Sequence, residues 1–165
     1  VRYWAIPGTP GFEHRNGGLE KDYEKGSIST DGENHQKMVD TRAEKVENVT
    51  AVIPDLTVSG SEDADLLVIG WGGTRGHLMS AVSEMNEKGK KVALAHFNYI
   101  NPLPKNTAEV ISKYKKVVVC ELNNGQFASF LRSKVPGVNF LQHNKVQGQP
   151  FTMAELVEHF ELILK

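Results

Sequence analysis

Several classes of protein are excluded by what this sequence lacks. It has a single cysteine, Cys120, so no internal disulfide can form, and one thiol within an apolar run fits a reducing cytoplasm. The formal net charge is −1, which argues against nucleic acid as a partner. No apolar run is long enough to span a bilayer and no signal peptide is visible, so we expect no membrane contact. The composition is that of a cytoplasmic globular protein whose 165 residues suffice for one domain and an appendage.

Recognisable catalytic and metal-binding patterns are also missing. The six histidines are scattered, without the paired His or Cys spacing of a structural zinc site. A glycine-rich stretch contains Gly70 and Gly72, but Arg75 stands where a dinucleotide-binding motif has its third glycine. That motif also needs an acidic residue after the second strand, where this chain has His96 and Asn98. We therefore expect a tight turn rather than a dinucleotide site, and no self-contained catalytic set.

The most informative stretch is residues 66–74, an apolar run that stops at glycines. A continuous apolar run bounded by turn residues is typical of a strand buried on both faces of a sheet. The order strand, glycine turn, helix is the opening of a βαβ unit, so we expect at least one of Gly72 and Gly73 to adopt a positive φ. The predicted helix, residues 75–89, carries one apolar stripe formed by Leu78, Ala81, Val82 and Met85.

The rest of the chain repeats this alternation of strands and helices. Strands are predicted at residues 92–97, 117–121 and 138–141, and helices at 107–114, around Phe127, and after a capping box from Thr152 to Glu155. The last helix is expected to bury the side formed by Met153, Leu156, Val157, Phe160 and Leu164. The alternation predicts a three-layer α/β domain over residues 58–165, with an open and mostly parallel sheet.

Residues 1–57 are different and are predicted to be an interdomain connector with one helix. Residues 1–30 are rich in glycine and proline turns and show no helical or strand period. Residues 31–50 predict a helix capped by Asp31, and residues 56–59 a short edge strand. Rings outside periodic elements need a surface to cover, so we expect residues 1–30 to be mobile or to dock on another domain or on a second copy, making a homodimer. The rings are those of Tyr3, Trp4, Phe12 and His14.

Three strand ends carry the residues that we single out as interface or ligand candidates. Ligands of parallel sheets collect at the carboxyl ends of the strands. Glu121 at such an end could act as a general base, cap the next helix or pin the neighbouring loop. His96 could contact a ligand or bond to loop backbone, and Cys120 is expected to be packed and inert. The candidates are Gly70, Gly72, Gly73, Thr74, His96, Asn98, Glu121, Asn123 and Gln126.

Read together, the stretches at these strand ends form a combined pattern. They are Gly70-Trp71-Gly72-Gly73-Thr74 with Gly76, then His96-Phe97-Asn98-Tyr99-Ile100-Asn101-Pro102-Leu103-Pro104, then Glu121-Leu122-Asn123-Asn124-Gly125-Gln126. The pattern resembles the C-terminal region of the alpha subunits of 2-oxoacid:ferredoxin oxidoreductases, the 2-oxoglutarate type above all. The lead-in from Pro7 to His14, with Gly26 and the helix that contains Arg42, resembles the segment that joins the pyrimidine-binding domain of that subunit to this region. The resemblance covers nearly all of the chain, which we read as a piece of a longer polypeptide.

The resemblance implies a thiamine-diphosphate enzyme that oxidatively decarboxylates a 2-oxoacid, transfers the acyl group to coenzyme A and passes electrons through iron–sulfur clusters to ferredoxin. It implies a fold like the transketolase C-terminal domain, and the rest of the alpha subunit, the beta subunit and ferredoxin as partners. In that family the thiamine cofactor lies between two other domains, and one cysteine cannot hold a four-thiolate cluster. We therefore expect no catalytic, cofactor-binding or metal residue in this chain, and no activity from the chain alone.

Two functions of different classes stay open at this point. The first is a part of the oxidoreductase that serves domain and subunit assembly rather than chemistry. The second is a nucleotide- or small-acid-binding α/β module that acts independently through its strand ends. The equivalent domain of a transketolase or dehydrogenase relative is a third interpretation.

Overall fold

The computed structural model describes residues 4–14 and 17–165, so Tyr3, one of the rings considered above, lies outside the described residues. The chain divides into two compact units, residues 1–45 and 46–165. The first holds most of helix α1 (Gly32–Glu47), and the second holds a sheet with helices around it. The boundary between connector and domain at residues 57 and 58 stays a prediction.

In the first unit, the segment before α1 is tied to the helix by polar contacts. The carboxylate of Asp31 accepts a hydrogen bond from the N–H of Asn34 at 2.8 Å, which confirms the predicted helix cap. The Glu20 carboxylate pairs with Nη1 of Arg42 at 2.9 Å and with Nδ1 of His35 at 2.7 Å. These two bonds, the one from Arg42 first, lower the pKa of the Glu20 carboxyl to about 2. The chain ahead of α1 is therefore docked on this helix at Glu20.

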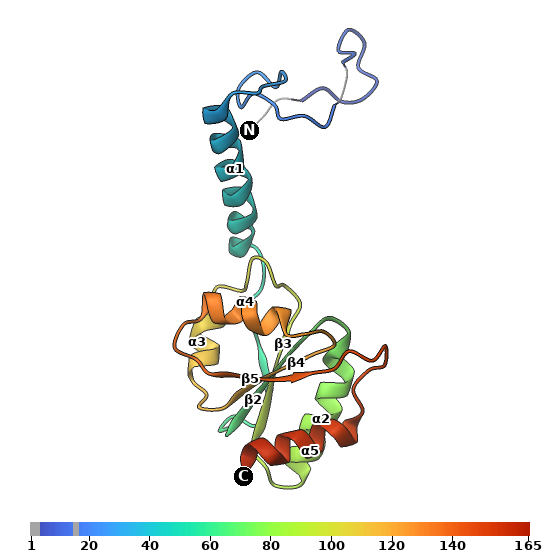
Figure 1. Ribbon diagram of the computed structural model, residues 1–165, viewed down its shortest axis with the longest axis vertical. Coiled ribbons are helices and arrows are strands. Elements are labelled where there is room, and N and C mark those ends of the chain that lie inside the picture. The colour runs from blue at the N-terminus through green and yellow to red at the C-terminus, as the bar shows by residue number, and fades with distance from the viewer. Residues whose placement is uncertain (1–3, 15–16) are drawn as a thin grey trace. The chain divides into compact units, whose positions relative to one another are not determined.

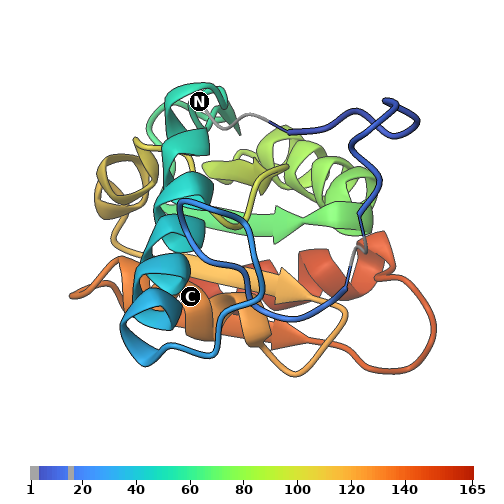
Figure 2. The same ribbon diagram turned by 90° about the horizontal axis from the view of Figure 1, so that it is seen from above.

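The second unit is built on a five-stranded sheet with the strand order β1-β3-β2-β4-β5. The strand predicted from the apolar run at residues 66–74 is β2, and it is the central strand of the sheet. Strands β2 to β5 pair in parallel, whereas the short β1 pairs antiparallel with β3. Figure 2 shows the arrows of β2 (green) and β4 (orange) pointing the same way. The strands are β1 Val58–Gly60, β2 Leu66–Trp71, β3 Val92–Phe97, β4 Val117–Glu121 and β5 Phe140–Asn144.

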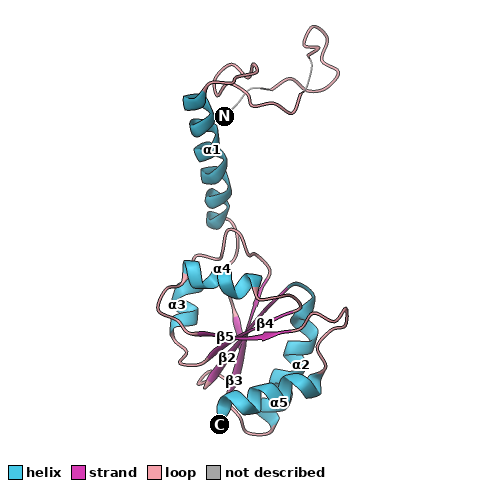
Figure 3. Ribbon diagram, in the orientation of Figure 1, coloured by secondary structure: helices cyan, strands magenta, loops and turns pink. Residues whose placement is uncertain are grey.

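Helices cover both faces of this sheet (Figures 1 and 3). Helices α3 and α4 lie on one face, and α2 and α5 lie on the other. The three-layer α/β architecture predicted from the alternation of elements is therefore confirmed. The helices are α2 Arg75–Glu87, α3 Thr107–Ser112, α4 Gln126–Lys134 and α5 Met153–Leu164, with short 3-10 turns at Asn48–Ala51 and Gly72–Thr74.

Two hydrophobic cores result from this layering, one on each side of the sheet. Leu67 and Ile69 of β2 belong to the core under α3 and α4. Leu66 and Val68 belong to the core under α2 and α5. All four side chains are fully buried, because alternate residues of a strand point to opposite faces and both faces are covered. The unbroken apolar run of β2 is thus explained by its central place.

Several details of the sequence-based prediction are wrong. The short edge strand is Val58–Gly60 rather than residues 56–59, and the helix predicted at residues 107–114 ends at Ser112. The last strand begins at Phe140 rather than at residue 138, because the ladder with β4 starts where Phe140 pairs with Val117. Met153, expected on the core side of α5, is 46% exposed, while Leu156 and Phe160 are buried. Met153 is the first residue of α5, and the buried side begins only with the next turn.

No helix among the described residues combines the length and the apolar character that a membrane-spanning segment requires.

We predict that truncating Ile69 to alanine destabilises the second unit strongly. The side chain is fully buried in the central strand, so the cavity left by Ile69→Ala should lower the free energy of unfolding by roughly 2–5 kcal/mol. Urea unfolding followed by circular dichroism measures this loss. Ile100→Ala is the matched control, since the same atoms are removed from a side chain that is 37% exposed. Equal losses in the two variants would contradict the central position of Ile69.

Candidate functional site

The candidate site is the carboxyl edge of the sheet, where β2 and β4 lie side by side. The helix that follows β2 covers one face of the sheet, and the helix that follows β4 covers the other. In open α/β sheets such a reversal opens a crevice beyond the strand ends, where ligands bind. In this chain that position lies at Trp71, the last residue of β2, and Glu121, the last residue of β4.

A buried carboxylate, that of Glu121, occupies this position. Its oxygens accept hydrogen bonds from the backbone N–H groups of Phe127 at 2.8 Å and Ala128 at 2.9 Å, in the first turn of α4. They also accept from Nδ2 of Asn123 at 3.0 Å and from the indole N–H of Trp71 at 3.3 Å. A carboxylate at a helix N-terminus satisfies free backbone donors and interacts favourably with the helix dipole. Of the roles left open above, the structure shows helix capping, and the bond from Asn123 also pins the neighbouring loop.

The loop between Glu121 and α4 is shaped by a second polar side chain. Oδ1 of Asn123 accepts hydrogen bonds from the backbone N–H groups of Gly125 at 2.7 Å and Gln126 at 3.1 Å. Gly125 has a φ of +90° and leads directly into α4. A glycine is needed here, because an added Cβ would collide with the side chain of Gln142 and the backbone is left-handed. The side chain of Asn123 and the backbone of Gln126 thus form one turn.

The glycine-rich stretch after β2 is a tight turn, as predicted. Gly72 has a φ of +58°, and a 3-10 turn leads from it into α2. Oγ1 of Thr74 donates to the carbonyl of Trp71 at 2.9 Å and accepts from its backbone N–H at 3.2 Å. At Gly70 an added Cβ would collide with Leu78, so this glycine lets α2 pack closely on β2. These positions serve turn geometry and packing.

His96, near the end of β3, is bonded to the same turn. Its Nε2 lies 3.1 Å from the carbonyl oxygen of Gly72 and must donate the proton, since a carbonyl can only accept. Burial of the half-exposed ring lowers the pKa of the His96 imidazole. The expected alternative of a histidine bonded to loop backbone is confirmed. The ring also lines a hollow of about 160 Å³ together with Arg75, Ser59 and Asn98.

Cys120 precedes Glu121 and faces the core under α2 and α5. It is fully buried. Burial raises the pKa of the Cys120 thiol, and the adjacent Glu121 carboxylate raises it further. A thiol that stays protonated is a poor nucleophile and a poor metal ligand, so the expected packed and inert role is confirmed.

The structure joins most of the candidates in one series of hydrogen bonds across three neighbouring strands. The series runs from His96 through the turn at Gly72 and Trp71 to Glu121 and Asn123. Asn98 is exposed but interacts with the ring of His96, the first member of the series, whereas the side chain of Gln126 is exposed and stands outside it. Trp71 is the member that sequence reasoning did not single out. An indole N–H at the end of a buried strand needs an acceptor, and a carboxylate at the end of another strand was the signal that could have identified the pair.

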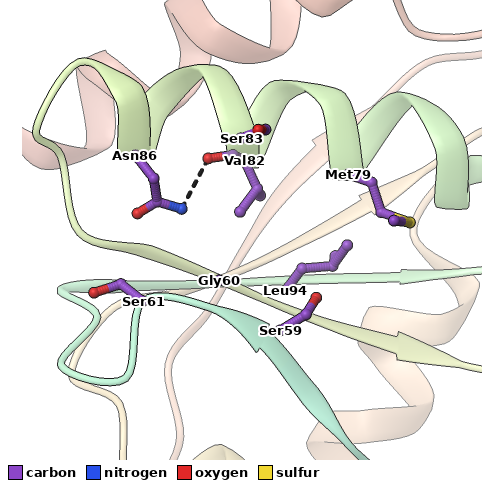
Figure 4. Close-up of a pocket in the computed structure, with 8 residues that line it drawn as sticks. All are labelled: Ser59, Gly60, Ser61, Met79, Val82, Ser83, Asn86 and Leu94. Carbon is purple, nitrogen blue, oxygen red and sulfur yellow. Dashed lines mark hydrogen bonds between the residues drawn. The ribbon is translucent and has the colours of Figure 1, made fainter.

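A larger groove lies toward the start of β3, away from the carboxyl edge. It has a volume of about 520 Å³ and lies between α2 and strands β1 and β3, as Figure 4 shows. Its apolar floor comes from Val82 and Leu94, and its rim carries the hydroxyl groups of Ser59 and Ser83. Asn86 closes one end and is saturated by backbone contacts, so it offers a ligand no free amide. Among the described residues, no group of three or more His, Cys, Asp or Glu side chains could hold a metal ion.

Comparisons of the sequence identify relatives along almost the whole chain. A family model described as pyruvate:ferredoxin oxidoreductase core domain II matches residues 64–156. The chain is 45% identical to the 2-oxoglutarate oxidoreductase subunit KorA of Mycobacterium tuberculosis, over 94% of this chain and 24% of that protein. It is 32% identical to the alpha subunit of 2-oxoacid:ferredoxin oxidoreductase 1 of Aeropyrum pernix, over 82% of this chain and 22% of that protein. The chain thus spans about a quarter of the length of the curated relatives it matches.

Comparison with solved structures points the same way. A 2-oxoglutarate:ferredoxin oxidoreductase of Magnetococcus marinus, solved with 2-oxoglutarate, coenzyme A and succinyl-CoA bound, matches with a TM-score of 0.84 at 29% identity. This match covers 98% of the chain and 28% of that protein. A split-gene transketolase matches with a TM-score of 0.50 at 13% identity, which shows a shared fold alone. The resemblance drawn from the three strand ends, and the expected likeness to the transketolase fold, are confirmed.

We predict that Glu121→Gln destabilises the second unit by about 1–3 kcal/mol, because the amide N–H₂ would face backbone donors that then lose a buried acceptor. Chemical unfolding monitored by tryptophan fluorescence measures the loss. Glu109→Gln provides the control, since this exposed carboxylate on α3 has Lys113 in the neighbouring turn as its one ion-pair partner among the described residues. A Glu121→Gln protein as stable as the control would show that the buried carboxylate does not hold the edge together.

The two adjacent glycines of the turn should respond differently to alanine. Gly72 has positive φ and Gly73 does not, while neither has a heavy atom within 4 Å of an added Cβ. Gly72→Ala should therefore lower stability by on the order of 1 kcal/mol through backbone strain, and Gly73→Ala should be close to neutral. Differential scanning calorimetry of the two variants provides the comparison. Identical melting temperatures would rule out a strained turn at Gly72.

Proposed function

This chain belongs to the pyruvate:ferredoxin oxidoreductase core domain II family, and we propose that it is a C-terminal part of the alpha subunit of a thiamine-diphosphate-dependent 2-oxoglutarate:ferredoxin oxidoreductase. That enzyme oxidatively decarboxylates 2-oxoglutarate, forms the acyl-CoA and passes the electrons through iron–sulfur clusters to ferredoxin. This part of the subunit serves the assembly of domains and subunits, and the chemistry takes place on other domains.

The observation that carries the proposal is the 45% identity to the mycobacterial 2-oxoglutarate oxidoreductase subunit over 94% of this chain. The match to the Magnetococcus enzyme supports the same substrate, since that protein is named for 2-oxoglutarate. An independent nucleotide- or small-acid-binding module is not favoured, because both relatives carry this region inside a much longer subunit.

The residues of the carboxyl edge support assembly rather than catalysis. Glu121, the carboxylate best placed for a general base, is fully buried and bonded to four donors. The thiol of Cys120 is buried as well, and its raised pKa keeps it protonated. An iron–sulfur cluster does not fit this donor set, since a cluster needs several exposed thiolates and the sequence has one cysteine. The carboxylate and the thiol that could do chemistry at this edge are thus either bonded or buried.

Apolar side chains on the loops of this edge provide a surface for a neighbouring domain. Tyr99 and Ile100 follow β3 and are 43% and 37% exposed, and Leu122 follows β4 and is 41% exposed. In the first unit, Trp4 and Phe12 are left uncovered by residues of their own unit. We expect other domains or subunits to cover these side chains in the assembled enzyme, where they would join a larger apolar contact.

The proposal is tested on the intact alpha subunit, produced together with its beta subunit. We expect the complex to reduce ferredoxin when 2-oxoglutarate and coenzyme A are supplied. Leu122→Asp should lower the amount of assembled complex about tenfold or more, because it places a charge in a buried contact. Gel filtration with light scattering measures assembly, and ferredoxin reduction measures activity.

Leu162→Asp is the control, since Leu162 is 58% exposed on α5, away from the carboxyl edge. It should leave assembly unchanged. If the wild-type complex does not reduce ferredoxin with 2-oxoglutarate, the proposed substrate is wrong. If the Leu122→Asp subunit assembles as well as the control, the proposed assembly role of the edge is wrong. Micromolar binding of thiamine diphosphate by the 165-residue chain alone would contradict the absence of a cofactor site.

A further inference from the structure

The amino edge of the sheet, opposite the candidate site, carries a hollow whose lining is strongly basic. Its volume is about 470 Å³, which is in the range of small-molecule sites. An apolar floor comes from Ala64 and Leu164, and Asp65 is the one acidic residue among those that line it. The basic lining residues are Lys90, Lys91, Lys113, Lys115 and Lys116.

The lysines reach this hollow from two turns on opposite sides of β2. Lys91 directly precedes β3, and its carbonyl accepts a hydrogen bond from the N–H of Asp65 at 2.8 Å. Lys116 directly precedes β4, and its carbonyl accepts from the N–H of Leu67 at 2.9 Å. Since β3 and β4 flank β2, these two turns lie about 10 Å apart, two strand spacings. Flexible four-carbon stems allow ammonium groups from both turns to converge on one ligand between them.

Among the described residues, only two of these five lysines have a polar partner for the ammonium group. Nζ of Lys116 donates to the carbonyl of Ile163 at 2.7 Å, at the C-terminal end of α5. Nζ of Lys113 pairs with Glu109 at 2.9 Å. Within the described part of the chain, the ammonium groups of Lys90, Lys91 and Lys115 make no hydrogen bond or ion pair.

Helix ends offset some of the remaining charge but not all of it. Lysines near helix C-termini interact favourably with the negative ends of the helix dipoles, each equivalent to about half a unit charge. Helices α2, α3 and α5 all end near this edge, because their chains turn there into the next strand or, for α5, reach Leu164. Three such ends and the carboxylates of Asp65 and Glu109 still leave roughly one to two positive charges facing the hollow.

We propose that this hollow, defined by the five lysines, binds a small molecule that carries a diphosphate or triphosphate group. Adjacent phosphates supply several negative charges at the spacing of convergent ammonium groups, and lysine binds phosphate as a point charge without a demand on geometry. The floor of Ala64 and Leu164 gives an organic part of the ligand an apolar contact. This site is separate from the carboxyl edge and does not depend on the oxidoreductase assignment.

The test is calorimetric titration of the 165-residue chain with inorganic tripolyphosphate at low salt. The double variant Lys90→Ala/Lys115→Ala removes two ammonium groups that have no partner and should weaken binding about tenfold or more. The control Lys105→Ala/Lys134→Ala removes the same charge elsewhere in the unit, from a lysine paired with Asp55 and one placed over Phe130, and should leave the affinity within about twofold. All four lysines are exposed, and thermal melting confirms that both variants fold.

Two further measurements keep the outcome specific. Amide chemical shifts should move at Asp65 and at the two lysine turns, and pyrophosphate and ADP should compete with tripolyphosphate. Tighter binding of ADP than of pyrophosphate assigns a nucleotide-type ligand, and equal binding assigns recognition of the phosphates alone. No binding of tripolyphosphate to the wild-type chain, or an equal loss in the control variant, would overturn the site.

Discussion

The carboxylate of Glu121 is the interaction on which the carboxyl edge of this domain depends. It is fully buried, yet four donors from three parts of the chain meet at its two oxygens. A buried carboxylate is costly unless such donors replace its hydration, and donors of a helix N-terminus are costly to bury without an acceptor. The carboxylate and the N–H donors therefore offset each other's cost of burial. Together they fix the start of α4 against the ends of β2 and β4.

This arrangement explains why the usual ligand position of an open α/β sheet offers so little to a ligand. The ends of β2 and β4 are bridged by a hydrogen bond of 3.3 Å from the indole N–H of Trp71 to the carboxylate of Glu121. The turn after β2 is held by Thr74 and by His96, whose ring nitrogen donates to the carbonyl of Gly72. Polar groups that could take part in chemistry are used to hold loops in place. A rigid edge with exposed apolar side chains is suited to contact with another domain, which is the role proposed for this part of the alpha subunit.

The two edges of the same sheet differ in character for a topological reason. Parallel strands place every helix N-terminus at the carboxyl edge and every helix C-terminus at the amino edge. An acidic side chain is therefore stabilised at the first edge, as with Glu121 at α4, and lysines are stabilised at the second, as with Lys116 at α5. The lysines at the amino edge exceed what the helix ends and nearby carboxylates offset, and that excess is the basis for the proposed phosphate site.

The sequence by itself determined the layers of the domain, and only the tertiary structure decided what the strand ends do. The apolar run at residues 66–69 predicts a strand buried on both faces. The apolar stripe from Leu78 to Met85 predicts the helix that covers one face of that strand. Both predictions succeed because they depend on local sequence patterns. The start of β5 at Phe140 depends on pairing with Val117, and no local pattern contains that register. Likewise the Trp71–Glu121 contact joins residues fifty positions apart, so sequence reasoning could name the carboxylate and three roles for it but not its partner. The sequence states which side chains can donate or accept a hydrogen bond. A hydrogen bond also needs its two groups at one place, and only folding brings groups that are distant in the sequence together.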